Sequence, residues 1–324
     1  MLRPKALRID DVVAVVATSG GLEEDSVPLF ERGVMLLERM GFVVRVSPLV
    51  DVDRSWWWAA APPTEAAEEL NRHLRDPEVR AIFSLTGGRM TLSYLDLIDL
   101  EAVRADPKPV LGMSDISALH LALHARTGLV SLHSDLLTVG FGEWDEKGPA
   151  RRLELANLYH RVLTKDAPLG PLPAGRPWES WRPGRAEGPL IGGMLNRLVR
   201  VQATASALSP ERFDGAILFW EEAFTSTATV WNDLHVLRQA GVLDRISGMV
   251  VGRPFEVETT TPGPDSLRDI VLEVVGERAI PVLGDVDIGH AGPNLPMPVG
   301  VRAEMDADAR TLSLLETVVT ASGG

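Results

Sequence analysis

Cysteine is absent from the 324 residues of the chain. This absence excludes disulfide bonds, thiolate metal sites and a cysteine nucleophile. The sequence also lacks any stretch approaching the roughly 20 apolar residues that a transmembrane helix requires. A short basic patch near the N-terminus is not followed by an apolar segment of the signal-peptide type. We therefore expect a cytoplasmic protein that does not use a membrane as a partner.

Positive charge is scarce: 32 Lys and Arg residues stand against 45 Asp and Glu residues, for a formal net charge of -13. A general nucleic-acid-binding protein needs clustered Lys and Arg to neutralise phosphates, so we expect no nucleic-acid partner. Hydrophobic residues make up 45% of the chain, enough for a substantial core. The length exceeds the size at which one core usually stops growing, which predicts two domains.

The first half of the chain alternates short apolar runs with segments of helical period. The runs VVAVVAT (12–18) and VRAIFSLT (79–86) predict buried strands, and residues 27–40 predict a helix that ends at Gly41. This alternation is typical of a parallel sheet covered by helices on both faces. We predict an N-terminal, three-layer α/β domain over residues 1–165.

Proline and glycine become dense between residues 166 and 187, a composition that suits neither a helix nor a central strand. We interpret this segment as a linker. A second α/β set follows, in which residues 227–239 and 266–275 predict helices. Strands are expected near 216–220, 246–252, 280–286, 299–304 and 311–315. We predict a smaller C-terminal α/β domain with a mixed sheet over residues 188–324.

Ligands of open α/β sheets bind beyond the carboxyl ends of the strands, where loops converge and helix N-termini present free amides. Four polar segments occupy such places in this chain. They are TGGR after residues 83–85, GMSD after the apolar pair at 110–111, EE after residues 218–220, and GHAGPN after residues 282–287. We expect these segments to meet at one site.

Ser114, in GMSD, has two possible roles. Taken alone it favours a helix N-cap, because Ser and Asp accept hydrogen bonds from free helix amides and caps far outnumber nucleophiles. The G-x-S-x-G frame of the usual nucleophile elbow is missing. A serine nucleophile also needs a base within hydrogen-bond reach and a group that orients the base.

Histidines supply the candidate base. His120 and His124 form an i, i+4 pair, but the glutamate of a zinc peptidase does not follow the first of them, so a packed helix face is the favoured interpretation and we expect no metal. His73 and His160 lie in polar helical patterns typical of a surface. His290 lies in a loop of glycines and prolines that would hold an imidazole firmly, and a purely structural loop histidine is an equal alternative.

The sequence leaves the roles of three further features undecided. Glu221 and Glu222 end a strand, so only one of them faces a given cleft. The Gly87–Gly88 pair is either half of an oxyanion hole or an ordinary tight turn. The tryptophan run at 56–58 cannot face one core throughout, which indicates a ligand surface or a subunit contact.

Several blocks of the chain, in this order, resemble the LD-carboxypeptidase family of serine peptidases, which includes the microcin C immunity peptidases. The blocks are RIDDVVAVVATSGG, DPEVRAIFSLTGG, KPVLGMSDISALHLAL, GPLIGGMLNRL, ILFWEE, GMVVGRP and DIGHAGPNLPMPVG. The resemblance implies a catalytic triad of Ser114, Glu221 and His290 at the domain interface. It also implies an oxyanion hole from the amides of Gly88 and Asp115, no cofactor, and a homodimer.

The resemblance also bears on the substrate. Murein-recycling members carry R-G-G-Y-G where this chain has TGGRM, and the GRP block and the tryptophan-bearing segment before GPLIGG are closer to the immunity branch. That branch cleaves the amide between an aminoacyl group and a nucleotide-like moiety. We expect Trp178 or Trp181 to stack on the base and Arg253 to bind an anionic group. The alternatives are a murein tetrapeptide carboxypeptidase and a catalytically inactive binding protein on the same scaffold.

Overall fold

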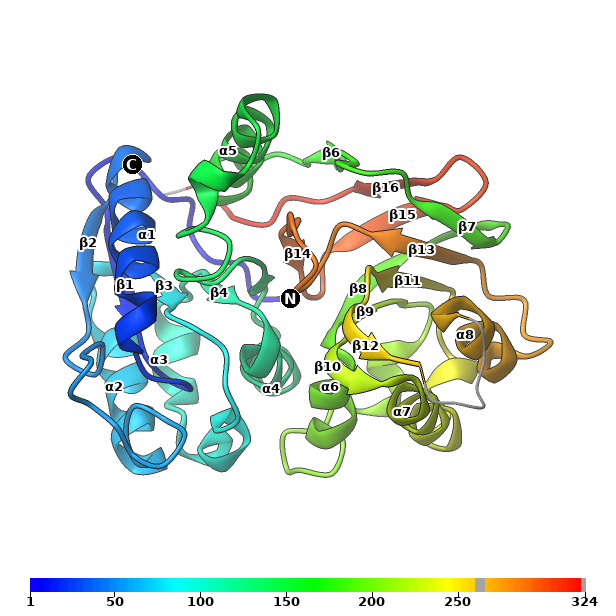
Figure 1. Ribbon diagram of the computed structural model, residues 1–324, viewed down its shortest axis with the longest axis horizontal. Helices are drawn as coiled ribbons and strands as arrows, with labels where there is room; N and C mark the ends of the chain where they lie inside the picture. Colours follow the sequence, from blue (N-terminus) through cyan, green and yellow to red (C-terminus); the bar gives the residue numbers. More distant parts are fainter. Residues whose placement is uncertain (260–265, 322–324) are drawn as a thin grey trace.

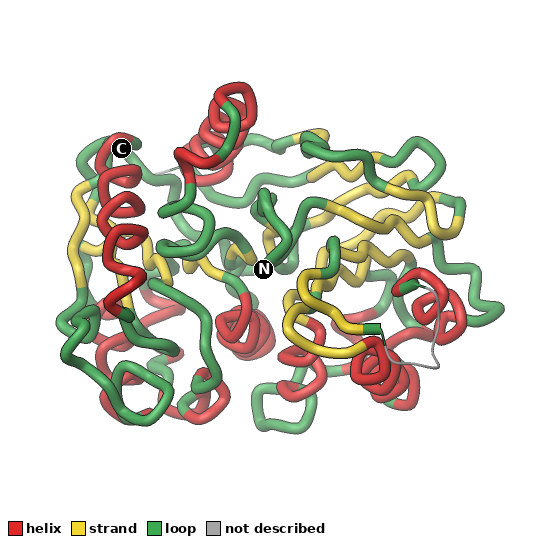
Figure 2. Tube along the Cα trace, viewed as in Figure 1, coloured by secondary structure: helices red, strands yellow, loops and turns green. Residues whose placement is uncertain are grey.

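The computed structural model describes residues 1–259 and 266–321. Within these ranges the chain forms two α/β parts that lie side by side, each built on its own large sheet (Figure 1). Figure 2 shows the strands of each sheet grouped together with helices beside them. The expected two-domain α/β architecture is therefore confirmed. In the described ranges, no helix is both long enough and apolar enough to span a bilayer.

The N-terminal sheet has the order β14-β5-β4-β3-β1-β2 in the described part of the chain. Its parallel strands are β1 (Val12–Val16), β2 (Val43–Val46), β3 (Val79–Ser84), β4 (Val110–Gly112) and β5 (Leu132–His133). The intervening helices are α1 (Val27–Arg39), α2 (Pro63–Arg75), α3 (Leu100–Ala105) and α4 (Ser117–Thr127). The central strands β1, β3 and β4 are almost wholly buried and appear in the sequence as largely apolar runs, whereas the edge strand β2 is exposed or half-buried.

The C-terminal sheet is mixed. Its parallel centre consists of β8 (Arg185–Met194), β9 (Ile217–Glu221), β11 (Gly248–Gly252) and β13 (Val282–Val286). The antiparallel strands β15 (Arg302–Asp306) and β16 (Thr311–Leu314) continue it beyond β8. Its helices are α6 (Leu195–Val201), α7 (Thr227–Gln239) and α8 (Leu267–Val275). The predicted bounds of α7 are confirmed, and Ser266 caps α8 by accepting a hydrogen bond from the amide of Asp269.

The segment predicted as a linker, 166–187, contributes to the C-terminal sheet. It contains β6 (Gly170–Pro171) and β7 (Glu179–Arg182), which form the two edges of that sheet, and it runs into the start of β8. Proline is tolerated at a sheet edge because no neighbouring strand needs its missing N–H. The segment is therefore structured rather than a plain connection. It follows the helix α5 (Pro149–Thr164), whose bounds were not predicted, although His160 was expected in a helical pattern.

One strand from the C-terminal half returns to the N-terminal sheet. β14 (Met297–Pro298) pairs antiparallel with β5, and in Figure 1 it lies near the middle of the molecule. The loop between β13 and β14 must therefore cross from one sheet to the other. This loop carries His290, so the chain path brings the histidine to the interface between the two parts.

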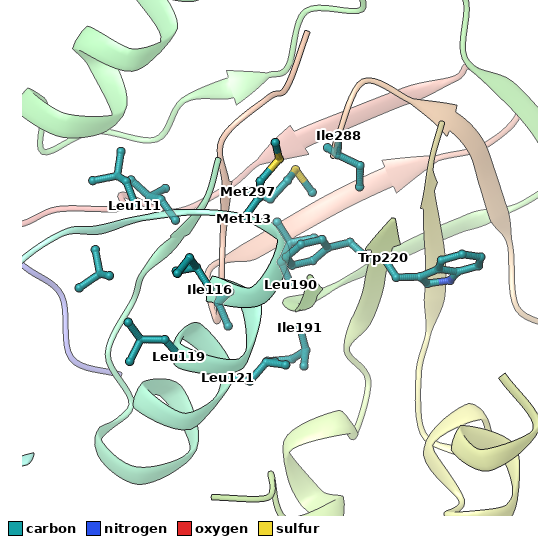
Figure 3. Packing of buried hydrophobic residues seen from close by; sticks show 14 of the residues in the cluster. Leu111, Met113, Ile116, Leu119, Leu121, Leu190, Ile191, Trp220, Ile288 and Met297 are labelled. Carbon is teal, nitrogen blue, oxygen red and sulfur yellow. The ribbon is translucent and has the colours of Figure 1, made fainter. Parts of the chain in front are cut away.

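The two parts share one continuous apolar core. Figure 3 shows Leu121 of α4 beside Ile191 of β8. Apolar packing of this kind fixes the relative position of the two sheets. Side chains that reach the interface from the two parts are therefore held at fixed positions relative to one another.

A separate two-stranded sheet pairs β10 (Ala223–Ser226) with β12 (Phe255–Glu258).

The histidines on α4 lie in the core, as expected, since His120 and His124 are buried. The prediction for His73 is wrong: this side chain is buried and its Nε2 lies 2.9 Å from Glu69 Oε1. A carboxylate four residues earlier on α2 satisfies the ring, which a surface-like polar pattern does not reveal.

Candidate active site

Ser114 lies on a sharp turn between β4 and α4. Its φ is +60°, a left-handed backbone value that is uncommon for a residue with a side chain. The N-cap of α4 is Ile116, and the Ser114 hydroxyl caps neither α4 nor the short 3-10 turn before it. Its Oγ instead lies 3.9 Å from Met194 Sδ and is partly exposed. The cap interpretation is therefore wrong, and the strained turn presents the hydroxyl at the domain interface.

The TGG turn packs directly against this serine. A Cβ added to Gly87 would lie 2.8 Å from Ser114 Oγ, and one added to Gly88 would lie 2.6 Å from the backbone N of Gly20. Only glycine fits at either position without displacing a neighbour. Among the described residues, the amides of Gly88 and Asp115 have no hydrogen-bond acceptor. Two free N–H groups next to a serine hydroxyl suit the stabilisation of a developing oxyanion.

The carboxylate of Asp115 organises the surrounding loops. One oxygen accepts hydrogen bonds from the Ser19 hydroxyl at 2.6 Å and from the amides of Met90 and Thr91, each at 2.8 Å. The other accepts from Arg197 Nε at 2.6 Å, across the domain interface. Burial acts to raise the pKa of Asp115, but the charge of Arg197 and the hydrogen bond from Ser19 outweigh burial and lower that pKa. The sequence analysis assigned a role only to the amide of Asp115 and missed Arg197.

His290 and Glu221 form a buried pair. His290 Nδ1 lies 2.7 Å from Glu221 Oε2, and the His290 amide donates to the same oxygen at 3.4 Å. The loop is held by a hydrogen bond of 2.9 Å from the Gly289 amide to Asn294 Oδ1. Burial opposes charge on both groups, yet their mutual attraction dominates: it raises the pKa of His290 and lowers the pKa of Glu221. The carboxylate thus fixes the ring orientation and leaves Nε2 free to accept a proton.

The two adjacent glutamates face opposite ways, as strand geometry requires. Glu222 accepts hydrogen bonds from the amide and side chain of Asn196, at 2.9 and 2.8 Å. Burial, followed by the neighbouring charge of Glu221, raises the pKa of Glu222 to about 7. Glu222 therefore positions Asn196 rather than the histidine.

Ser114 and His290 approach the same region from different strands. The two loops touch, because Asn294 Nδ2 lies 3.4 Å from the sulfur of Met113, the residue before the serine. Within the described residues no hydrogen bond joins Ser114 Oγ to His290. In ligand-free enzymes such bonds are often long and tighten only in the substrate complex.

Three cavities among the described residues surround these groups. The first, ≈ 390 Å³, is lined by His290 and Met113 together with the basic residues Lys147, Arg151 and Arg176. The second, ≈ 340 Å³, contains Ser114, Gly88, Met194, Asn196 and Phe224 in its wall. The third, ≈ 280 Å³, shares Gly88 with the second and is lined on another side by Trp58. The serine and the histidine thus line separate cavities.

The predicted stacking residues lie elsewhere. Trp178 is 2% exposed and its indole N–H donates to Asp287 at 3.4 Å, while Trp181 is 6% exposed and packs against Gly284. Neither tryptophan lines any of the three cavities. Their rings fill the C-terminal core, so neither presents a free face to a ligand in this structure.

Arg253 likewise lies outside the three cavities. Its Nη1 donates to the Asp285 carbonyl at 2.9 Å and lies 3.5 Å from Asp287 Oδ1. A guanidinium already paired with a buried carboxylate is a poor receptor for a second anion. Of the tryptophans discussed, Trp58 lines one of the three cavities; it is 61% exposed and belongs to the run that the sequence had marked as a possible ligand surface.

Comparison with known proteins shows the family of the chain. Residues 13–134 match the model of the LD-carboxypeptidase N-terminal domain, and residues 187–305 match that of the LD-carboxypeptidase C-terminal domain. The chain belongs to the LD-carboxypeptidase family. It is therefore a peptidase, a hydrolase of peptide or amide bonds.

Individual relatives of this LD-carboxypeptidase family member span nearly the whole chain. A Vibrio cholerae relative is 30% identical over 342 residues, covering 99% of this chain and 100% of its own. The Escherichia coli microcin C7 self-immunity protein MccF is 27% identical, with 96% of this chain and 94% of MccF covered. The murein tetrapeptide carboxypeptidase of Pseudomonas aeruginosa is 26% identical, with coverage of 93% and 94%. The structure of MccF in complex with glutamyl sulfamoyl guanosine superposes with a TM-score of 0.88 at 26% identity, covering 99% of this chain and 100% of that one.

Proposed function

We propose that this peptidase uses Ser114 as its nucleophile, His290 as general base and acid, and Glu221 as the group that orients the base. The observation that carries the proposal is the buried His290–Glu221 pair, with 2.7 Å between Nδ1 and Oε2, at the interface where Ser114 sits on a strained turn. A buried carboxylate on one ring nitrogen sets the tautomer that a serine peptidase requires. Ser114 is the serine next to two unpaired amides, which supports it over other hydroxyls.

The reaction follows from these positions. Ser114 Oγ attacks the carbonyl carbon of the scissile amide while His290 Nε2 takes the hydroxyl proton. The oxyanion of the tetrahedral intermediate accepts hydrogen bonds from the amides of Gly88 and Asp115. When the C–N bond breaks, His290 returns the proton to the leaving amine. Water, activated by the same imidazole, then hydrolyses the acyl-enzyme and regenerates the serine. The proposed steps use side chains and amides of the chain itself.

For the substrate we propose an aminoacyl- or peptidyl-nucleotide, cleaved at the amide beside the nucleotide-like part. Two observations support this choice. The E. coli relative is named for microcin C7 self-immunity, and its structure holds an aminoacyl sulfamoyl nucleoside. In this chain, the cavity lined by Trp58 adjoins the serine cavity through Gly88, so an indole face is available near the nucleophile. Aromatic side chains bind planar bases by stacking.

A second candidate substrate is a murein peptide with a free terminal carboxylate. The cavity beside His290 contains the basic residues Lys147 and Arg176, which attract a carboxylate, and its wall also carries the acidic residues Asp135, Glu143 and Glu146. The Pseudomonas aeruginosa relative is named as a murein tetrapeptide carboxypeptidase. Pocket polarity rather than the triad decides between the two substrates.

The test offers purified protein an aminoacyl sulfamoyl adenosine and a murein L,D-tetrapeptide side by side, with release of the amine product followed by mass spectrometry. We expect faster cleavage of the nucleotide analogue and loss of all cleavage in Ser114→Ala. Preference for the tetrapeptide would establish the second substrate. Retained activity in Ser114→Ala would overturn the proposed nucleophile. Intact-mass analysis after treatment with a fluorophosphonate provides an independent check, because an active serine gains one covalent adduct.

The homodimer stays a prediction. The tryptophan run at 56–58 leaves Trp57 75% exposed in the single chain, and Trp56 and Trp57 stack with ring centroids 4.2 Å apart. Large exposed aromatic groups are typical of interfaces. Sedimentation equilibrium of the whole protein distinguishes a monomer from a dimer.

A further inference from the structure

Glu221 has one carboxylate oxygen without a hydrogen-bond donor. Oε2 accepts from the ring and the amide of His290, but Oε1 is buried and has no partner among the described residues. A buried carboxylate oxygen without a donor is costly, and buried polar atoms in native proteins are nearly always satisfied by protein or by ordered water. The structure therefore calls for a donor near Oε1.

His133, at the end of β5, carries the complementary unpaired atom. The side chain is buried, and its Nε2 has no partner within the described chain. The ring packs edge-on against Phe219, with the two ring centroids 5.8 Å apart. Phe219 and Glu221 are two residues apart on β9, so their side chains project from the same face of the strand. His133 consequently lies beneath the face that bears Glu221.

Hydrogen bonds on the other side of the ring indicate which nitrogen holds the proton. The amide of Met194 donates to Ser117 Oγ at 2.9 Å, and this oxygen lies 3.3 Å from His133 Nδ1. With one acceptor site of Ser117 used by the amide, its hydroxyl proton is available to Nδ1. His133 then carries its own proton on Nε2. That arrangement supplies a donor on the side where Glu221 Oε1 lacks one.

We propose that His133 is a positioning residue for the triad, and that its Nε2–H holds Glu221 Oε1 through one buried water. The chain of groups runs from Ser117 through His133 and the water to Glu221, and from there to His290. By fixing Oε1, it directs Oε2 toward the His290 ring. The inference rests on the proposed function, since it assigns a task within the Ser114, His290 and Glu221 triad. A water between two polar groups that are too far apart for a direct bond is a common solution in protein interiors.

The charge state of His133 agrees with this role. Burial lowers its pKa to about 4, against the opposing effect of the Glu221 charge, so the ring is neutral near pH 7. Because the His133 ring is neutral, it can orient the Glu221 carboxylate without competing with His290 for the negative charge of that carboxylate. The carboxylate then remains fully available to the imidazolium that forms during catalysis.

The experiment compares two amide replacements of His133 in the whole protein. The side-chain nitrogen of glutamine reaches the position of Nε2, whereas that of asparagine reaches only the position of Nδ1. We expect His133→Asn to lower kcat by about 10- to 100-fold with KM changed by less than about twofold, and His133→Gln to restore most of kcat. Equal losses in the two variants, or a change in KM alone, would overturn the inference, because a purely structural role does not distinguish the two amides.

A double-mutant cycle provides the second arm. In a Glu221→Gln background, His133→Asn should cause little further loss of kcat, because the oxygen that His133 orients is no longer a carboxylate. An undiminished loss in that background would contradict the inference. The proposed function is tested by a different variant: an active Ser114→Ala protein would overturn it without any measurement on His133.

If the variants fold poorly, the inference can be tested on the wild-type protein. Long-range ¹H–¹⁵N spectra report the tautomer of His133 directly. A proton on Nε2 is expected, and a proton on Nδ1 would exclude donation toward Glu221.

Discussion

The buried ion pair between Arg197 and Asp115 joins the two parts of the molecule beside the nucleophile. Its Nε–Oδ1 distance is 2.6 Å, and the two side chains are 7% and 1% exposed. Replacement by methionine in Arg197→Met keeps much of the side-chain volume but leaves the carboxylate buried without its counter-charge. Breaking a buried pair from one side costs about 3–5 kcal/mol. For a protein of this size, with an unfolding entropy of about 2.1 cal/mol/K per residue, that corresponds to a fall in Tm of roughly 4–7 °C.

A surface pair of the same length provides the matched control. Arg302 and Glu187 are also 2.6 Å apart, but their side chains are 47% and 52% exposed. Water screens such a pair, so Arg302→Met should change the free energy of unfolding by at most about 1 kcal/mol. Thermal unfolding followed by circular dichroism measures both variants. Equal falls in Tm would refute the reasoning, because burial would then have no influence on the energy of the pair.

Arg197→Met should also affect the rate. Asp115 holds the amides of Met90 and Thr91, and through them the TGG turn that carries the Gly88 amide. Loosening this turn misplaces one oxyanion donor, and loss of such a donor costs about 10²- to 10³-fold in kcat. We expect a fall in kcat of up to that size at 25 °C, where the variant is still folded. A variant that is destabilised but fully active would show that the carboxylate does not position the oxyanion hole.

Two further predictions concern the base and the substrate cavity. His290 must be neutral to act as base, so kcat/KM should rise with pH through a pKa above the ordinary 6.5 of histidine. In Glu221→Gln, kcat should fall by about 10⁴-fold, and this limb should move to lower pH, because the main contribution that opposes burial is removed from the pKa of His290; an unmoved limb would contradict the pairing. Trp58→Ala should raise KM for a nucleotide substrate by roughly tenfold or more, since stacking contributes about 1–3 kcal/mol per base. Its exposed neighbour serves as control: Trp57→Ala should change KM by less than about twofold, and equal effects in both variants would remove Trp58 from the binding site.

The sequence by itself determined the local structure and the chemical inventory. Largely apolar runs such as 12–16 and 79–84 predicted strands, since burial on both faces of a parallel sheet leaves few polar positions. The bounds of α7 followed from its helical period, and the structure adds that Ser226 caps the helix. The ordered blocks also indicated the family and the residues proposed as its triad, because short motifs with fixed neighbours do not depend on long-range contacts.

Only the tertiary structure decided how these residues are used. The GMSD motif is compatible with a cap, and the left-handed backbone of Ser114 became apparent only in the fold. Trp178 was expected in the pocket, but the antiparallel edge strand formed by 179–182 draws its segment into the core. Arg197 was missed because its partner is 82 residues away. The periodicity of the sequence indicates which face of a helix or strand is buried. The element that packs against that face depends on the strand order and on the chain crossings, which bring distant segments together.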